Sequence, residues 1–141
     1  MDTDRDTDGG RRRPHLLIAE DDVLLGALLV DALDADYELS RARTAAHAGV
    51  LLAAGGLDVL LLDWRLAEGT AAAVLRDADW LGVPALLISG DPGTVADMAR
   101  RGRPALAKPF VLAELQDALR DLLAASHPVW HTSRPPTGDA A

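Results

Sequence analysis

The chain has 141 residues, no cysteine and a formal net charge of −8. This length supports one ordinary domain with its own hydrophobic core, and the lack of cysteine excludes disulfides and thiolate metal sites. The acidity lies in residues 15–125 and argues against binding to a nucleic-acid backbone, while the absence of a long apolar run indicates a cytoplasmic location.

Short apolar runs alternate with segments of helical length through the middle of the chain. The predicted strands span residues 15–20, 37–42, 58–63, 84–90 and 104–108. The predicted helices span residues 21–35, 44–56, 70–81, 91–102 and 111–125. This alternation predicts an α/β fold, a doubly wound five-stranded parallel sheet with five helices, in which the second strand lies at an edge.

Two helices carry apolar stripes that are expected to face the core. In the first helix the predicted core stripe is Leu25, Leu28, Leu29, Ala32 and Leu33. This leaves an apolar outer face for docking of a partner, or for coverage by loops or by the tail with Trp130; the outer face comprises Val23, Leu24, Ala27 and Val30. In the last helix the predicted stripe is Val111, Leu112, Leu115, Ala118, Leu119, Leu122 and Leu123.

Both flanks are expected to be disordered. Residues 1–14 have no apolar periodicity, and residues 126–141 are rich in Pro, Ser, Thr and Gly. The folded domain is therefore predicted over residues 15–125. The C-terminal flank is too short and too polar to form a DNA-binding domain, so no direct nucleic-acid contact is expected.

Polar residues that can carry chemistry stand where the predicted strands end. They are Glu20 and Asp21 after the first strand, Asp63 on the third, Ser89 on the fourth and Lys108 on the fifth. Because parallel strands bring their carboxyl ends to one edge, these side chains are expected to converge there.

Three converging carboxylates need counter-charge, since two of them about 5 Å apart repel by roughly 3 kcal/mol at an effective dielectric near 20. Lys108 and a divalent cation would supply it, and a ligand set made only of oxygen indicates Mg²⁺. With cations on both sides, the carboxylate of Asp63 could attack phosphorus and form an aspartyl phosphate. Ser89 could then donate its hydroxyl to a phosphoryl oxygen and make phosphorylation a conformational switch.

The segments LLIAEDD, DVLLLDWRL, LLISG and AKPF, in this order at successive strand ends, resemble the receiver domain of two-component response regulators. The resemblance covers residues 15–124 and implies the flavodoxin-like receiver fold and a role in a phosphorelay. It implies that Asp63 is the phosphoacceptor and that Glu20 and Asp21 are the acid pair. It further implies that Asp21, Asp63 and the backbone carbonyl of Arg65 hold Mg²⁺.

The same resemblance implies Ser89 as the switch hydroxyl and Lys108 as the phosphate-binding lysine, with a cis peptide between Lys108 and Pro109. A histidine kinase or a histidine phosphotransfer protein would be the phosphodonor. Such a domain is not a conventional enzyme, because it catalyses only its own phosphorylation and dephosphorylation.

The sequence departs from the usual receiver pattern in several places. The spacings from Asp63 to Ser89 and from Ser89 to Lys108 are each a few residues short, which predicts a shortened third loop and fourth helix. Ala105 stands where many receivers carry an aromatic switch residue. These features, with RPALAKPF at the fifth strand, are similar to a group of stand-alone receivers.

Other interpretations stay open from the residues alone. The acids at 20–22 could be helix caps, with Asp22 the best candidate, Ser89 could belong to a turn, and Lys108 could be a surface lysine. The chain could also be an interaction module that is never phosphorylated. A phosphohydrolase of the haloacid dehalogenase type fits less well, because its nucleophile usually lies on the first strand. Arg65 and Asp91 are further hypothesised to pair across the mouth of the site.

Overall fold

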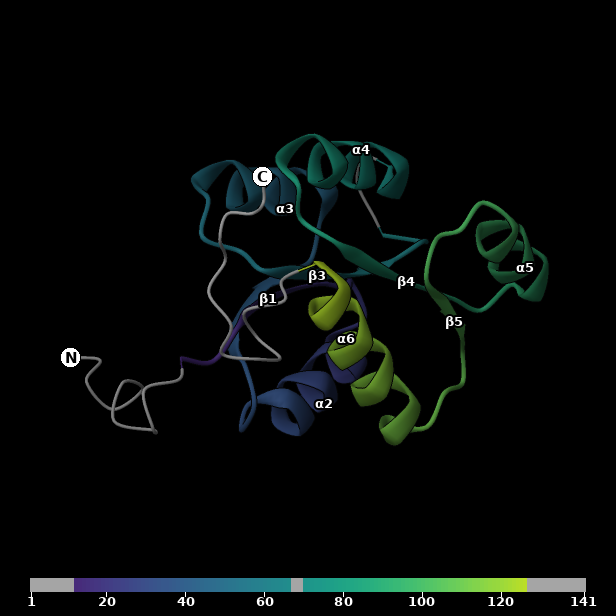
Figure 1. Cartoon of the computed structure of the whole chain (residues 1–141), viewed down its shortest axis with the longest axis horizontal. Helices are drawn as coiled ribbons and strands as arrows, with labels where there is room; N and C mark the ends of the chain where they lie inside the picture. Colours follow the sequence, from purple (N-terminus) through teal and green to yellow (C-terminus); the bar gives the residue numbers. More distant parts are fainter. Residues whose placement is uncertain (1–11, 67–69, 127–141) are drawn as a thin grey trace.

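The structure is a computed structural model that describes residues 12–66 and 70–126 (Figure 1). Trp130 and most of the two predicted flanks lie outside the described residues. In the part that is described, no helix has the length and apolar character needed to cross a bilayer.

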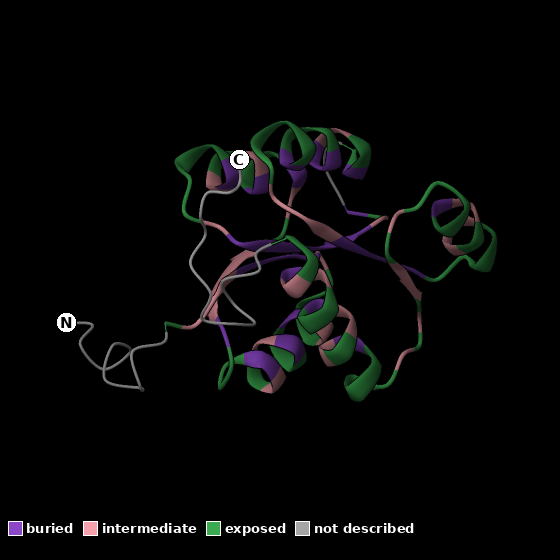
Figure 2. Cartoon of the chain, in the orientation of Figure 1, coloured by how far each residue is buried: buried purple, intermediate pink, exposed green. Residues whose placement is uncertain are grey.

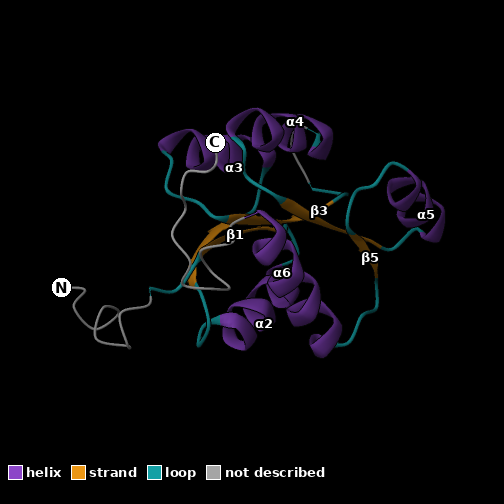
Figure 3. Cartoon of the chain, viewed as in Figure 1, coloured by secondary structure: helices purple, strands orange, loops and turns teal. Residues whose placement is uncertain are grey.

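Strands and helices alternate strictly along the described chain (Figure 3). The strands are β1 (His15–Ala19), β2 (Glu38–Ala42), β3 (Val59–Asp63), β4 (Ala85–Ser89) and β5 (Ala105–Ala107). The helices are α2 (Val23–Leu33), α3 (Ala45–Ala54), α4 (Ala71–Leu81), α5 (Pro92–Arg100) and α6 (Leu112–Ser126). All ten predicted elements are present, and α5, the helix expected to be short, has nine residues.

The strands form one parallel sheet in the order β2-β1-β3-β4-β5. Since β1 pairs with β2 on one side and with β3 on the other, the winding direction reverses between β1 and β3. The prediction of a doubly wound five-stranded sheet with β2 at an edge is confirmed.

Helices cover both faces of the sheet, with α3 and α4 on one side and α2 and α6 on the other (Figure 1). Successive residues of the central strands enter opposite apolar clusters. Leu60 and Leu62 of β3 pack under α3 and α4, whereas Val59 and Leu61 pack under α2 and α6. Burial on both faces explains why β3 reads as a continuous apolar run, and Figure 2 shows the buried residues concentrated between the layers.

Side-chain caps start the helices where the sequence predicts them. Asp22 accepts hydrogen bonds from the backbone N–H groups of Leu24 and Leu25 at 2.9 and 3.1 Å, and is therefore the cap of α2. Thr44 and Asp91 cap α3 and α5 in the same manner. Asp22 thus has a local structural role, in contrast to the acids that precede it.

The apolar stripes of α2 and α6 are narrower than predicted. Leu28 is 65% exposed and lies outside the core, whereas Val30, expected outside, packs partly against it. Val111 and Leu112 are likewise exposed, so their assignment to the core is wrong. The reason is geometric, because the buried residues cover a smaller arc of each helix surface than the sequence pattern suggests. The buried positions are Gly26, Leu29 and Leu33 in α2, and Leu115, Leu119 and Leu123 in α6.

Residues 12–14, which precede the predicted domain, contact it. The guanidinium of Arg12 lies 3.5 Å from the carboxylate of Asp58, and Arg13 donates to the carbonyl of Asp34 at 2.8 Å. The carbonyl of Pro14 accepts from Glu38 N at 2.9 Å. These three residues of the predicted N-terminal flank are therefore held against the folded domain.

Candidate functional site

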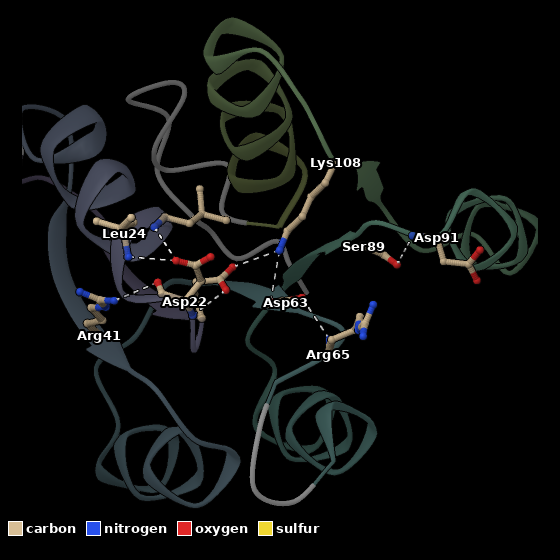
Figure 4. Close-up of polar contacts among 10 residues, drawn as sticks. Asp22, Leu24, Arg41, Asp63, Arg65, Ser89, Asp91 and Lys108 are labelled. Atoms are coloured by element: carbon tan, nitrogen blue, oxygen red, sulfur yellow. Dashed lines mark hydrogen bonds and ion pairs between the residues drawn. The ribbon is translucent and has the colours of Figure 1, made fainter.

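The carboxyl edge of the sheet brings together side chains from strands that are remote in sequence. Asp63 is the last residue of β3, Glu20 follows β1, Ser89 ends β4 and Lys108 follows β5. The lysine reaches over the edge, with Nζ 3.3 Å from Asp63 Oδ2 (Figure 4).

Three carboxylates form the centre of this site. Glu20, Asp21 and Asp63 each offer one oxygen, and these oxygens lie within 4.8 Å of one another. Glu20 is only 1% exposed and Asp63 only 3%. Lys108, with Nζ also 3.5 Å from Glu20 Oε1, is the ammonium that faces them. Within residues 12–66 and 70–126, one cation faces three acids, so the site carries excess negative charge where two of the three carboxylates are shielded from water.

Glu20 shows this imbalance most clearly. Its Oε2 accepts a hydrogen bond from Asp22 N at 3.0 Å, whereas its buried Oε1 has no hydrogen-bond partner among the described residues. Burial raises the pKa of Glu20 to about 7; the facing Asp63 carboxylate acts in the same direction, while the Asp22 N–H and Lys108 oppose it.

These observations fit a magnesium site. The donors are carboxylate oxygens, which Mg²⁺ prefers. Among the described residues, Glu20 Oε1 is a buried acceptor without a hydrogen bond, and it shares the Lys108 ammonium with Asp63. Asp63 Oδ1 accepts from Arg65 N at 3.0 Å, which ties the loop after β3 to the acid cluster.

Ser89 is buried and its hydroxyl oxygen accepts a hydrogen bond from Asp91 N at 3.0 Å. This contact uses the oxygen and leaves the hydroxyl proton available to a ligand. On the neighbouring chain segment, Lys108 N donates to Ser89 O at 2.8 Å, and the peptide between Lys108 and Pro109 is cis, as the resemblance implies.

The hypothesis that Arg65 and Asp91 pair across the mouth of the site is wrong. No ion pair joins them among the described residues, and Figure 4 shows their charged groups apart. The Asp91 carboxylate instead accepts from Thr94 Oγ1 at 2.8 Å and from Gly93 N at 3.3 Å. The Thr94 hydroxyl, the main cause, holds the pKa of Asp91 below its usual value. The Asp91 carboxylate therefore caps α5 and does not pair with Arg65.

Sequence reasoning missed one contact beside the acids. The guanidinium of Arg41 packs onto Gly26 and reaches the carbonyls of Asp22 and Val23. The sequence feature that could have indicated this contact is Gly26, which stands in the middle of a predicted helix and lowers its stability.

The chain is similar in sequence to a known regulatory protein. It is 33% identical over 107 residues to the swarming motility regulation protein RssB of Serratia marcescens, covering 72% of this chain and 49% of RssB. The chain thus spans about half the length of this curated relative. No protein-family model matches the chain.

Solved structures share the whole described fold. A response regulator receiver protein from Sinorhizobium medicae is 27% identical, with a TM-score of 0.73 over 82% of this chain and 98% of that one. The receiver domain of the sensor histidine kinase PA1611 from Pseudomonas aeruginosa is 22% identical, with a TM-score of 0.71 over 79% of this chain and 98% of that one. The latter structure holds a magnesium ion in its active-site cleft.

The described chain is a receiver domain of the response-regulator family, a class of signalling domains. The dehalogenase alternative does not hold, because Asp63 ends the third strand and the acid that follows the first strand is Glu20.

Proposed function

We propose that the protein is a phosphorelay switch that takes a phosphoryl group onto Asp63 in a magnesium-dependent reaction. The observation that carries the proposal is the surroundings of the Asp63 carboxylate. One of its oxygens faces the Lys108 ammonium, and the same side chain belongs to a cluster of three acids that lacks sufficient counter-charge. A carboxylate between two cationic positions suits phosphoryl transfer, in which negative charge spreads over the phosphoryl oxygens.

In the proposed reaction, an Asp63 oxygen attacks the phosphorus of a phosphohistidine. The new bond joins this oxygen to phosphorus, the bond between phosphorus and the imidazole nitrogen breaks, and the nitrogen leaves with the electron pair. Lys108 neutralises charge on a phosphoryl oxygen. The Ser89 hydroxyl donates a hydrogen bond to another phosphoryl oxygen, and so couples the phosphorylated state to the segment that leads into α5.

Mg²⁺ would be held by Glu20, Asp21, Asp63 and the backbone carbonyl of Arg65. When bound, it supplies positive charge for the acids and for the incoming phosphoryl oxygens. The burial of Glu20 Oε1 without a hydrogen-bond donor supports this assignment within the described chain.

The donor would be a histidine kinase or a histidine phosphotransfer protein. The surface proposed for its docking is the exposed apolar face of α2, formed by Val23, Leu24 and Leu28. This face borders the site, because Asp22 caps the same helix and the acids directly precede it. The receiver domain that we propose spans residues 15–125, and residues 12–14 lie in contact with it.

The test is incubation of the full chain with Mg²⁺ and acetyl phosphate, followed by intact-mass measurement. The expected result is an adduct of about 80 Da that requires Mg²⁺ and is absent from Asp63→Asn. Asp58→Asn is the matched control, because Asp58 is also buried but precedes β3 at its opposite end. Failure of the parent protein to form the adduct, with this donor and with a phosphorylated histidine phosphotransfer protein, would favour an interaction module that is never phosphorylated.

A further inference from the structure

Gly26 of α2 and Arg41 of β2 are in direct contact. A Cβ at position 26 would lie 2.0 Å from Arg41 Nη2 and 2.3 Å from its Cζ, so the guanidinium occupies the space that a side chain at 26 needs. Alanine would stabilise the helix interior better than glycine does. Glycine at position 26 therefore lowers the stability of the helix but leaves room for the guanidinium of Arg41.

The guanidinium contacts the start of α2. Arg41 Nη2 lies 3.3 Å from the carbonyl oxygen of Asp22 (Figure 4). It lies 3.3 Å from the carbonyl oxygen of Val23 as well. The next residue of β2 acts on the same segment, because Ala42 O accepts from Glu20 N at 3.0 Å. Two consecutive residues of β2 therefore hold both ends of the segment from Glu20 to Val23.

Asp21 lies between these two attachments. Its side chain is one of the three cluster acids, yet it makes no hydrogen bond or ion pair within residues 12–66 and 70–126. The position of its carboxylate consequently depends on the backbone held on either side of it.

Fold stability alone does not account for the placement of Arg41. Its two hydrogen bonds are long, and its buried Nε has no partner among the described residues. Since an unpaired buried donor costs about as much as one hydrogen bond contributes, the net gain for folding is small.

We propose that Arg41 is a positioning residue for the cation site: it holds the backbone of Asp22 and Val23 so that Asp21 faces Glu20 and Asp63. Gly26 is required for this arrangement, because any side chain at position 26 would displace the Arg41 guanidinium. The inference rests on the proposed function in treating the acid cluster as a Mg²⁺ site.

The test is a Mg²⁺ titration of the full chain, with the fluorescence of Trp64 as the readout. Trp64 is half-buried and directly follows Asp63. A Trp80→Phe/Trp130→Phe background removes the other two tryptophans. Gly26→Ala changes no charge and favours the helix, yet is expected to raise the Kd for Mg²⁺ about tenfold, as loss of a group that orients metal ligands does. It should melt at the same temperature as the parent or higher. In the absence of metal, hydrogen exchange of the Asp22 amide, which donates to Glu20 Oε2, should be faster.

A double-mutant cycle isolates the contact. Gly26→Ala should have no further effect on Mg²⁺ affinity in an Arg41→Ala background, because no guanidinium remains to be displaced. Arg43→Ala is the matched control, since it removes an exposed cation just beyond β2 and should leave the Kd within about twofold.

A Kd for Gly26→Ala within about twofold of the parent value, or an equal effect of this substitution in both backgrounds, would overturn the inference. A parent chain that binds no Mg²⁺ would overturn both this inference and the metal dependence of the proposed function. A parent that binds Mg²⁺ but accepts no phosphoryl group would overturn the proposed function alone.

Discussion

Lys108 and Asp63 form an ion pair across the carboxyl edge of the sheet, with Nζ 3.3 Å from Oδ2, although β4 lies between their two strands. The same ammonium is 3.5 Å from Glu20 Oε1. The acids at two strand ends, those of β1 and β3, thus depend on one flexible side chain for charge balance, and its removal should affect both stability and chemistry.

Replacement of Lys108 by alanine is expected to lower the free energy of unfolding by about 1–3 kcal/mol without Mg²⁺, because two buried carboxylates lose their cation. Saturating Mg²⁺ should stabilise this variant more than the parent. Urea denaturation with and without MgCl₂ measures both effects. Arg120→Ala, which removes a pair whose side chains are both 67% exposed, is the control and should cost less than about 1 kcal/mol. Equal losses in the two variants would contradict the role of Lys108.

Ser89→Ala is expected to separate phosphorylation from its structural effect. Asp63 should still accept a phosphoryl group, but the amide signals of Gly90 and Asp91 should respond far less, because no hydroxyl remains to bridge the phosphoryl group and the loop. Loss of the acceptor for Asp91 N should destabilise the protein by about 1 kcal/mol. Heteronuclear NMR before and after addition of acetyl phosphate measures the response.

Ser89→Thr keeps the hydroxyl and should retain the parent response. A full response in Ser89→Ala would show that the loop senses Asp63 by another route.

The exposed face of α2 should matter for a protein donor and not for a small one. Leu24 and Leu28 are 75% and 65% exposed, so replacing both by glutamine should change stability by less than about 1 kcal/mol. Transfer from a phosphorylated histidine phosphotransfer protein should slow at least about tenfold, which corresponds to about 1.4 kcal/mol of lost contact, while labelling by acetyl phosphate stays unchanged.

Trp80→Gln on α4 is the comparison, because Trp80 is 87% exposed on the opposite side of the sheet. If it slows protein-to-protein transfer as much as the α2 variant does, the docking assignment fails.

Tyr37 should make stability fall at alkaline pH. Burial raises the pKa of this residue to about 12, with the Asp36 carboxylate adding to the shift and Arg120 opposing it. Because the folded-state pKa lies above the unfolded value near 10, the stabilisation is complete below about pH 10 and is lost as the pH rises towards 12 and beyond.

Between pH 8 and 11 the parent should therefore lose about 1 kcal/mol more than Tyr37→Phe. Denaturation at a series of pH values measures this difference. Tyrosinate absorbance reports the titration directly, since Tyr37 is the single tyrosine of the chain. Titration near pH 10 in the folded protein would show that the ring is hydrated.

Local patterns were sufficient to predict the elements and the strand ends. Apolar runs with period two or without interruption specify strands, and an Asp or Thr before a helical segment specifies its start, as Asp22 and Thr44 show. Residues that end parallel strands must share one edge, so the convergence of Glu20, Asp63 and Lys108 followed from connectivity. Their chemical roles stay predictions.

What the sequence by itself determined, then, is the order of elements and the edge at which polar residues gather, because both depend on neighbours along the chain. Only the tertiary structure decided which groups meet there. The position of Leu28 in solvent, the capping role of Asp91 in place of a pair with Arg65, and the seat of Arg41 on Gly26 all depend on helix rotation and on distances between remote segments. A difference of a few ångströms separates a contact from none, and no periodicity along the chain encodes it.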